Sequence, residues 1–164
     1  MTTMVQSLLS VGLGEIKTAT QPGMVLTALG LGSCIGVAFY DPVARVGGMA
    51  HVVLPAPADT AAEASPKFAT VAVPALLQQM LTAGAERRRL VCTIAGGAQV
   101  LASVAMRDSF RIGERNIQAV LEALHRSASG RAPRTGGTTG RSLGLALPDG
   151  RVSVKKLGQD WKDL

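Results

Sequence analysis

The feature that most constrains the fold of this chain is the shortness of its apolar runs. Gly, Pro and Ser interrupt each run well before it could span a bilayer. The chain has 164 residues, of which 47% are hydrophobic and 17% charged, and this balance predicts one folded globular domain over residues 1–164. The first residues show neither a basic region nor a cleavage site, so we expect a native first strand rather than a signal peptide.

Several Val/Leu/Ile-rich segments that end at turn residues are predicted as strands. They cover residues 8–19, 24–31, 35–40, 46–54 and 89–97. The third and fourth of these flank Asp41-Pro42, which predicts a hairpin. A second hairpin is predicted within residues 142–156, around Pro148-Asp149-Gly150.

Two segments with helical periodicity complete the prediction. The first helix is expected to begin near Ser65-Pro66, to contain Pro74 at a kink, and to stop at Gly84. The second is expected from about Glu114 to Ala128, with its apolar face at Ile117, Val120, Leu121 and Leu124. The loop at 55–66 either covers a site or is a mobile connection. The order of strands, helix, strand, helix and hairpin indicates an α+β domain.

The net charge of +6 and the isoelectric point near 10.0 raise the question of nucleic-acid binding. Aromatic residues are only 3% of the chain, which leaves few stacking platforms for bases, and no known DNA- or RNA-binding motif is visible. We therefore expect no nucleic-acid partner. A basic solvated surface suits an acidic protein partner instead.

A cysteine and a histidine stand at the open end of the first predicted hairpin. Cys34 follows a glycine-rich run, and such a backbone can approach a ligand and direct N–H groups at an oxyanion. His51 ends the partner strand, so the hairpin predicts that the two residues lie near each other. A Cys–His pair can form a thiolate and protonate a leaving amine. A structural cysteine and a core histidine are the alternatives that spacing alone leaves open.

The remaining cysteine and histidine give weaker indications. Cys92 lies within an apolar strand and is predicted to be a buried hydrophobe, and His125 is predicted to be a solvated helix-end residue. One Cys and one His without further spaced ligands predict no metal site, and no phosphate-binding or dinucleotide motif predicts a cofactor. Two cysteines make no disulfide framework, which favours the cytoplasm.

The chain resembles the CheD family of chemoreceptor glutamine deamidases in several stretches that follow one another in order. These are TALGLGSCIGVAFYDPVARVGGMAHVVLP, KFATVAVPALLQQMLTAGA, TIAGGA, IGERNIQAVLEAL and TGGTTGRSLGLALPDGRVSV. The resemblance implies packed β-sheets with helices outside, similar to the fold of the deamidating cytotoxic necrotising factor toxins. It also implies a protein-glutamine glutaminase that converts glutamines of chemoreceptor cytoplasmic helices to glutamate through a thioester. A CheC-type phosphatase is an implied partner, and a weakly catalytic module regulating such a phosphatase is the alternative function.

In this resemblance Cys34 is the nucleophile and His51 its base, while N–H groups near Gly32, Ser33 and Cys34 hold the oxyanion. The family pattern has a threonine about six residues before the cysteine that orients the histidine, but Ala28 stands there and Thr27 precedes it. We predict that a β-bulge absorbs Ala28 and lets Thr27 reach His51. The alternative is a backbone carbonyl near Thr27 or Ala28. Arg134 also departs from the pattern, which has an acidic residue there.

Overall fold

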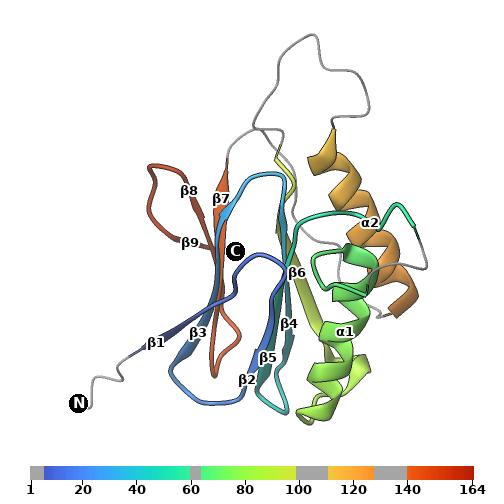
Figure 1. Cartoon of the computed structure of the whole chain (residues 1–164). Coiled ribbons are helices and arrows are strands. Elements are labelled where there is room, and N and C mark those ends of the chain that lie inside the picture. The colour runs from blue at the N-terminus through green and yellow to red at the C-terminus, as the bar shows by residue number, and fades with distance from the viewer. Residues whose placement is uncertain (1–5, 60–63, 99–110, 128–139) are drawn as a thin grey trace.

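The computed structural model of the chain describes residues 6–59, 64–98, 111–127 and 140–164. Figure 1 shows three layers: a five-stranded sheet, a four-stranded sheet, and two helices that cover the outer face of the four-stranded sheet. The predicted α+β class and the outer position of the helices are therefore confirmed.

The two sheets are mostly antiparallel. The five-stranded sheet has the order β1 (Ser7–Ser10), β3 (Met24–Leu31), β7 (Arg141–Ala146), β8 (Val152–Lys156) and β9 (Lys162–Asp163), with β1 parallel to β3. The four-stranded sheet has the order β2 (Ile16–Ala19), β5 (Val46–Val52), β4 (Ile35–Asp41) and β6 (Val91–Gly96). Both predicted hairpins are present, as β4–β5 and β7–β8.

The predicted strand over residues 8–19 is wrong as a single element. Its two halves, β1 and β2, belong to different sheets, and the turn at Gly14, where φ is +70°, carries the chain from one sheet to the other. Glycine adopts this conformation without steric cost. An apolar pattern cannot distinguish one long strand from two short ones that change sheets. This crossover lies directly over His51 and therefore matters for the site.

The helices are α1 (Ala69–Thr82), the short 3₁₀ turn η1 (Arg87–Arg89) and α2 (Ile112–Ser127). Helix α1 contains Pro74 but begins later than predicted, because the backbone of Lys67 and Phe68 pairs with the chain after β5. The predicted face of α2 is also partly wrong. Leu121 is 40% exposed, and the buried positions are Gly113, Asn116, Val120, Ala123 and Leu124.

Two apolar cores follow from the alternation of side chains along the strands. Odd-numbered residues of β4, such as Val37 and Phe39, pack against the helices. Its even-numbered residues, such as Ala38 and Tyr40, face the other sheet, where Leu26 and Leu143 join them. The even-numbered residues of β4 therefore form part of the interface between the two sheets.

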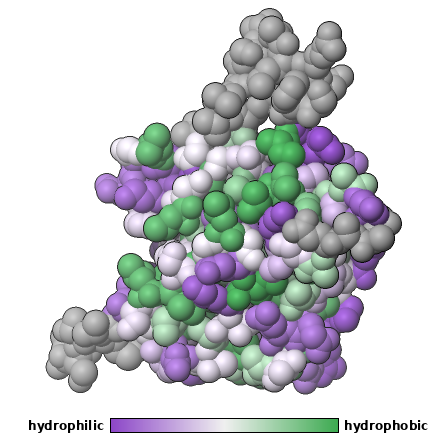
Figure 2. Space-filling view, viewed as in Figure 1, coloured by the Kyte–Doolittle hydropathy of each residue, from purple (hydrophilic) through white to green (hydrophobic). Residues whose placement is uncertain are grey.

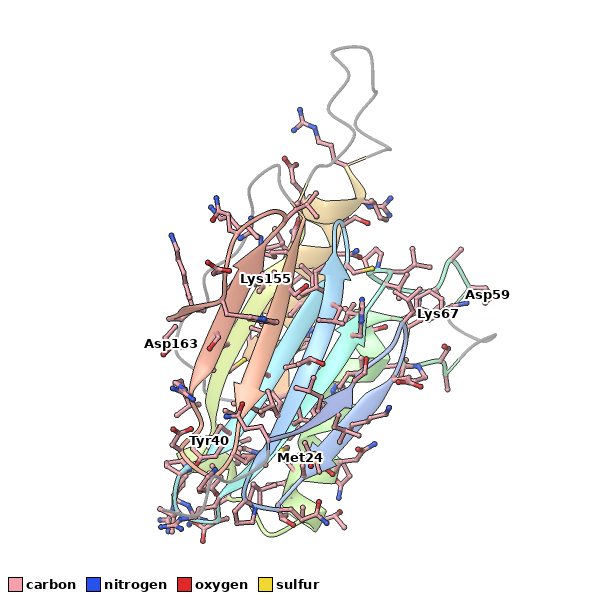
Figure 3. The ribbon with its side chains drawn as sticks, turned by 90° about the vertical axis from the view of Figure 1, so that its left-hand side faces the viewer. Met24, Tyr40, Asp59, Lys67, Lys155 and Asp163 are labelled. Atoms are coloured by element: carbon pink, nitrogen blue, oxygen red, sulfur yellow. The ribbon has the colours of Figure 1, made fainter. Side chains whose placement is uncertain are left out.

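The outer face of the five-stranded sheet has no helix over it within the described ranges (Figures 1 and 3). In Figure 3 Lys155 lies toward one end of the molecule and Tyr40 toward the other. Figure 2 shows apolar surface between polar patches. The most exposed large apolar side chains include Leu8, Leu13 and Leu157. Of the helices in the described ranges, neither α1 nor α2 is both long and apolar enough to cross a membrane.

Candidate active site

The β4–β5 hairpin brings Cys34 and His51 to one end of the sheet sandwich. Its ladder pairs Gly36 with His51 and ends at the pair Ile35–Val52, and Cys34 directly precedes β4. Paired residues share a face and alternate residues return to it, so Cys34, Gly36 and His51 all face the five-stranded sheet. The predicted proximity of the cysteine and the histidine therefore agrees with the observed register.

Three residues of the crossover between β1 and β2 form hydrogen bonds with His51. The imidazole Nδ1 lies 3.0 Å from the carbonyl oxygen of Val11, and the His51 backbone bonds to Glu15 and Gly14. A carbonyl only accepts hydrogen bonds, so Nδ1 carries a proton, and in the neutral ring Nε2 then presents a lone pair. His51 is only 3% exposed, and its Nε2 has no hydrogen-bond partner within the described part of the chain. This tautomer is the one that a general base requires.

The prediction that the Thr27 hydroxyl orients His51 is wrong. Leu26 and Ala28 belong to the core between the sheets, so Thr27 between them points to the other face. A bulge does occur in β3, but it lies between Ala28 and Leu31 and so does not turn Thr27 toward His51. The backbone alternative is closer to what is observed, although the carbonyl belongs to Val11. Thr27 contributes through its own carbonyl, which accepts the N–H of Val11 at 2.8 Å.

The turn before Cys34 is fixed through its carbonyl groups. Gly32 accepts the N–H of Ala98 at 2.8 Å, and Cys34 accepts that of Gly97 at 2.9 Å. Within the described residues, the backbone N–H groups of Ser33 and Cys34 donate to no backbone carbonyl. The carbonyls of the turn are therefore used, while its N–H groups donate to no backbone acceptor, as an oxyanion site requires.

The two cysteines differ in their surroundings. Cys34 is partly exposed, and burial raises the pKa of its thiol, while a contact from its own backbone N–H partly offsets this effect. Cys92 is 5% exposed in the core under the helices, where burial raises its pKa to about 12. Because both thiols are protonated near neutral pH, reaction at Cys34 needs a base at the moment of attack. His51 is the candidate base on the same face.

Asn116 joins this site although the sequence analysis gave it no role. It lies on α2 with 0% exposure, and its Nδ2 donates to the carbonyl oxygens of Ser33 and Val53, at 2.9 Å each. A polar residue within the helix's apolar periodicity was the available signal. Arg134, one of the departures noted above, lies outside the described residues.

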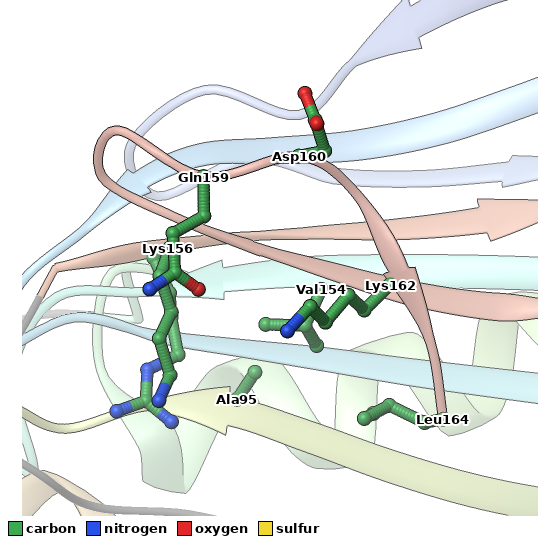
Figure 4. A pocket seen from close by; sticks show the side chains of 8 residues that line it. Ala95, Val154, Lys156, Gln159, Asp160, Lys162 and Leu164 are labelled. Carbon is green, nitrogen blue, oxygen red and sulfur yellow. The ribbon is translucent and has the colours of Figure 1, made fainter.

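One hollow borders the turn before Cys34, and a second hollow adjoins the first. One, of about 670 Å³, is lined by Gly30, Gly32 and Lys155. The other, of about 300 Å³, reaches Ala95 and Lys162 (Figure 4). The residues common to both hollows are Arg141, Lys156, Gln159 and Asp160. Four cationic side chains and one side-chain carboxylate line the two hollows together, and we call this surface the basic cleft.

These features define an α+β protein with a cysteine and an oriented histidine at one end of two packed sheets. The sequence model of the family described as "CheD chemotactic sensory transduction" matches residues 53–156, and the chain belongs to this CheD family. A "probable chemoreceptor glutamine deamidase CheD" of Symbiobacterium thermophilum is 44% identical over 158 residues, covering 94% of this chain and 96% of that protein. The "probable chemoreceptor glutamine deamidase CheD" of Archaeoglobus fulgidus is 41% identical over 157 residues, covering 92% of this chain and 96% of that protein.

Solved structures give a more distant likeness. The hypothetical protein YfiH of Bacillus licheniformis matches with a TM-score of 0.41 and 13% identity, covering 83% of this chain. YlmD of Geobacillus stearothermophilus matches with a TM-score of 0.41 and 12% identity, covering 81%. The matched regions span 60% and 61% of those two chains.

Proposed function

We propose that this chain is a protein-glutamine deamidase that converts glutamine side chains of chemoreceptors to glutamate. The observation that carries the proposal is the state of His51. Its Nδ1 is held by the Val11 carbonyl, and its Nε2, buried on the face that it shares with Cys34, has no hydrogen-bond partner in the described part of the chain. An unpaired buried acceptor is costly, and such groups are retained where a reaction uses them.

The first half of the reaction forms a thioester. His51 Nε2 takes the Cys34 proton while the sulfur attacks the carboxamide carbon of glutamine. The resulting oxyanion accepts hydrogen bonds from the N–H groups of Ser33 and Cys34. The hydrogen bond to the Gly32 carbonyl holds the turn that carries these groups. The imidazolium then donates its proton to the amide nitrogen, the C–N bond breaks, and ammonia leaves.

The second half restores the thiol. Water attacks the thioester carbonyl while His51 Nε2 takes a proton from it, and the C–S bond breaks. The proton passes to the Cys34 sulfur, and the product carries a new carboxylate. The Val11 carbonyl stabilises the imidazolium in both halves, because it accepts the Nδ1 proton throughout.

The basic cleft suits an acidic substrate surface. Arg141 and Lys156 are directly opposite each other in the β7–β8 ladder, so two cationic side chains lie together beside the cleft. The cleft reaches Gly32, two residues from the nucleophile. Acidic residues flanking the target glutamine, on the cytoplasmic helices of a chemoreceptor, would meet these cations.

Several further parts of the proposal follow from the family resemblance. The single domain, residues 1–164, acts in the cytoplasm, and its sheet packing is similar to that of the deamidating cytotoxic necrotising factor toxins. A CheC-type phosphatase is a partner. The alternative is a binding module that regulates this phosphatase with little catalysis. Because a binding module needs no oriented base, the state of His51 favours the enzyme.

The test is mass spectrometry of a chemoreceptor cytoplasmic fragment after incubation with the protein. Each deamidated glutamine gains about one dalton, because OH replaces NH₂. We expect this gain at discrete glutamines, and none in fragment incubated with buffer alone. A fragment that stays unmodified while binding the protein would favour the binding module.

A further inference from the structure

Asn116 is the polar residue among the buried positions of α2. Its side chain is fully buried, between the apolar positions that anchor the helix to the four-stranded sheet. Both hydrogen atoms of its amide group are used, toward Ser33 O and Val53 O at 2.9 Å each. Its Oδ1 is buried without a partner among the described residues, and a burial of this kind costs about 1–3 kcal/mol.

The two carbonyls that Asn116 contacts lie just beyond the end of the β4–β5 ladder. The last pair is Ile35–Val52, so Ser33 and Val53 flank the point where the strands separate. Two carbonyls cannot hydrogen-bond to each other, so a link between them needs a group that donates to both. An amide NH₂ supplies two donors at one atom, whereas a carboxylate supplies none and a hydroxyl one. Asn116 therefore continues the ladder by one step.

Gly113 brings the helix close enough for this contact. A Cβ at this position would lie 2.7 Å from the carbonyl oxygen of Gly97 and 2.8 Å from that of Ala98. Gly97 and Ala98 in turn donate to the carbonyls of Cys34 and Gly32. Residues three apart share one helix face, so Gly113 and Asn116 support the turn from the same side.

We propose that Asn116 is a positioning residue that sets the separation between Cys34 and His51. It fixes the residue before the nucleophile and the second residue after the base with one amide group. Without it, the strand ends separate and the thiol moves away from Nε2. A displacement of about 1 Å in such a pair lowers turnover by about 10²-fold.

The test is a double-mutant cycle read by alkylation of Cys34, which needs no substrate. In the wild type, His51→Gln slows iodoacetamide labelling of Cys34, because the base is lost. In Asn116→Asp, whose carboxylate has no hydrogen to donate, we expect His51→Gln to cause little further slowing. Gln118→Ala is the matched control, since Gln118 is an exposed amide on α2 that donates to Glu122. The full His51 effect in Asn116→Asp would overturn the proposal.

Turnover gives a second readout, and this part rests on the proposed function. We expect Asn116→Asp to lower kcat by about 10²-fold with KM nearly unchanged, because the substrate surface is intact. If the aspartate variant does not fold, Asn116→Ala and Gly113→Ala carry the same cycle. Wild-type kcat in a folded variant would overturn the proposal. A wild-type protein without deamidase activity would instead refute the proposed function, and the alkylation cycle would still decide the role of Asn116.

Discussion

The two ends of the β4–β5 hairpin carry polar groups in opposite states. At the closed end Asp41 is 0% exposed and forms an ion pair with Arg89 at 2.9 Å. Its carboxylate also accepts hydrogen bonds from the backbone N–H groups of Val43, Ala44 and Glu86. At the open end, His51 Nε2 and Asn116 Oδ1 are buried with no partner in the described part of the chain.

This difference separates stability from function within one hairpin. A buried charge with every lone pair satisfied holds the fold together, and removing one partner leaves the other unpaired. A buried acceptor without a partner lowers stability, so its retention needs another reason. At the open end, the proposed reaction of Cys34 with His51 as its base supplies that reason for the histidine nitrogen.

The largest expected effect is loss of activity in Cys34→Ala. The variant removes the nucleophile and little volume, so deamidation of the chemoreceptor fragment should fall by about 10⁴-fold or more while the melting temperature hardly changes. Cys92→Ala is the matched control: it should retain activity and lose some stability, since Cys92 is packed in the core. Activity in a folded Cys34→Ala would refute the assignment of the open end.

The second effect is on stability and concerns the closed end. Arg89 and three backbone N–H groups outweigh the effect of burial and hold the pKa of Asp41 well below its ordinary value. Asp41→Asn should lower the free energy of unfolding at pH 7 by about 3–5 kcal/mol in urea titrations. Asp163→Asn, at an exposed carboxylate, should change it little.

The pH dependence of this effect has a definite sign. A carboxyl whose pKa is depressed on folding stabilises the protein above its unfolded pKa, near 3.9, and this contribution is lost as pH falls through that value toward the lower folded pKa. The difference between wild type and Asp41→Asn should therefore shrink below about pH 4. A difference that is constant from pH 7 to pH 3 would contradict the ion-pair account of the closed end.

His51→Gln sharpens the comparison at the open end. It keeps a polar side chain but removes the imidazole proposed as the base, so kcat should fall by about 10²–10⁴-fold. The melting temperature should not fall in proportion, because Nε2 contributes no hydrogen bond to the described structure. A variant with wild-type kcat would show that another group takes the proton.

The smallest effect is expected for Thr27→Val. The hydroxyl lies on the face away from His51, and the carbonyl of Thr27, which holds Val11, is unchanged by the substitution. Turnover should match that of the wild type in the same fragment assay. A clear loss of kcat in a variant with normal stability would show that the Thr27 hydroxyl does take part in the reaction.

The sequence was sufficient for much of the fold and for the candidate pair. The hairpin spacing placed Cys34 and His51 at one end, because antiparallel pairing is determined by the turn. The sequence did not indicate which group orients His51. A backbone carbonyl such as that of Val11 has no residue-type signal, and it reaches the ring only because β1 and β2 belong to different sheets. Asn116 carried a signal, but its two partners lie 83 and 63 residues away.

The most direct test of the contrast between the two ends is site-resolved alkylation of the native protein. Wild type and His51→Gln are treated briefly with iodoacetamide near neutral pH, and peptide mass spectrometry quantifies labelling of Cys34 and Cys92. The account predicts that Cys34 reacts first and that His51→Gln slows it, while Cys92, whose pKa is about 12, stays unlabelled in both. Equal labelling of the two thiols, or a Cys34 rate that does not depend on His51, would contradict it.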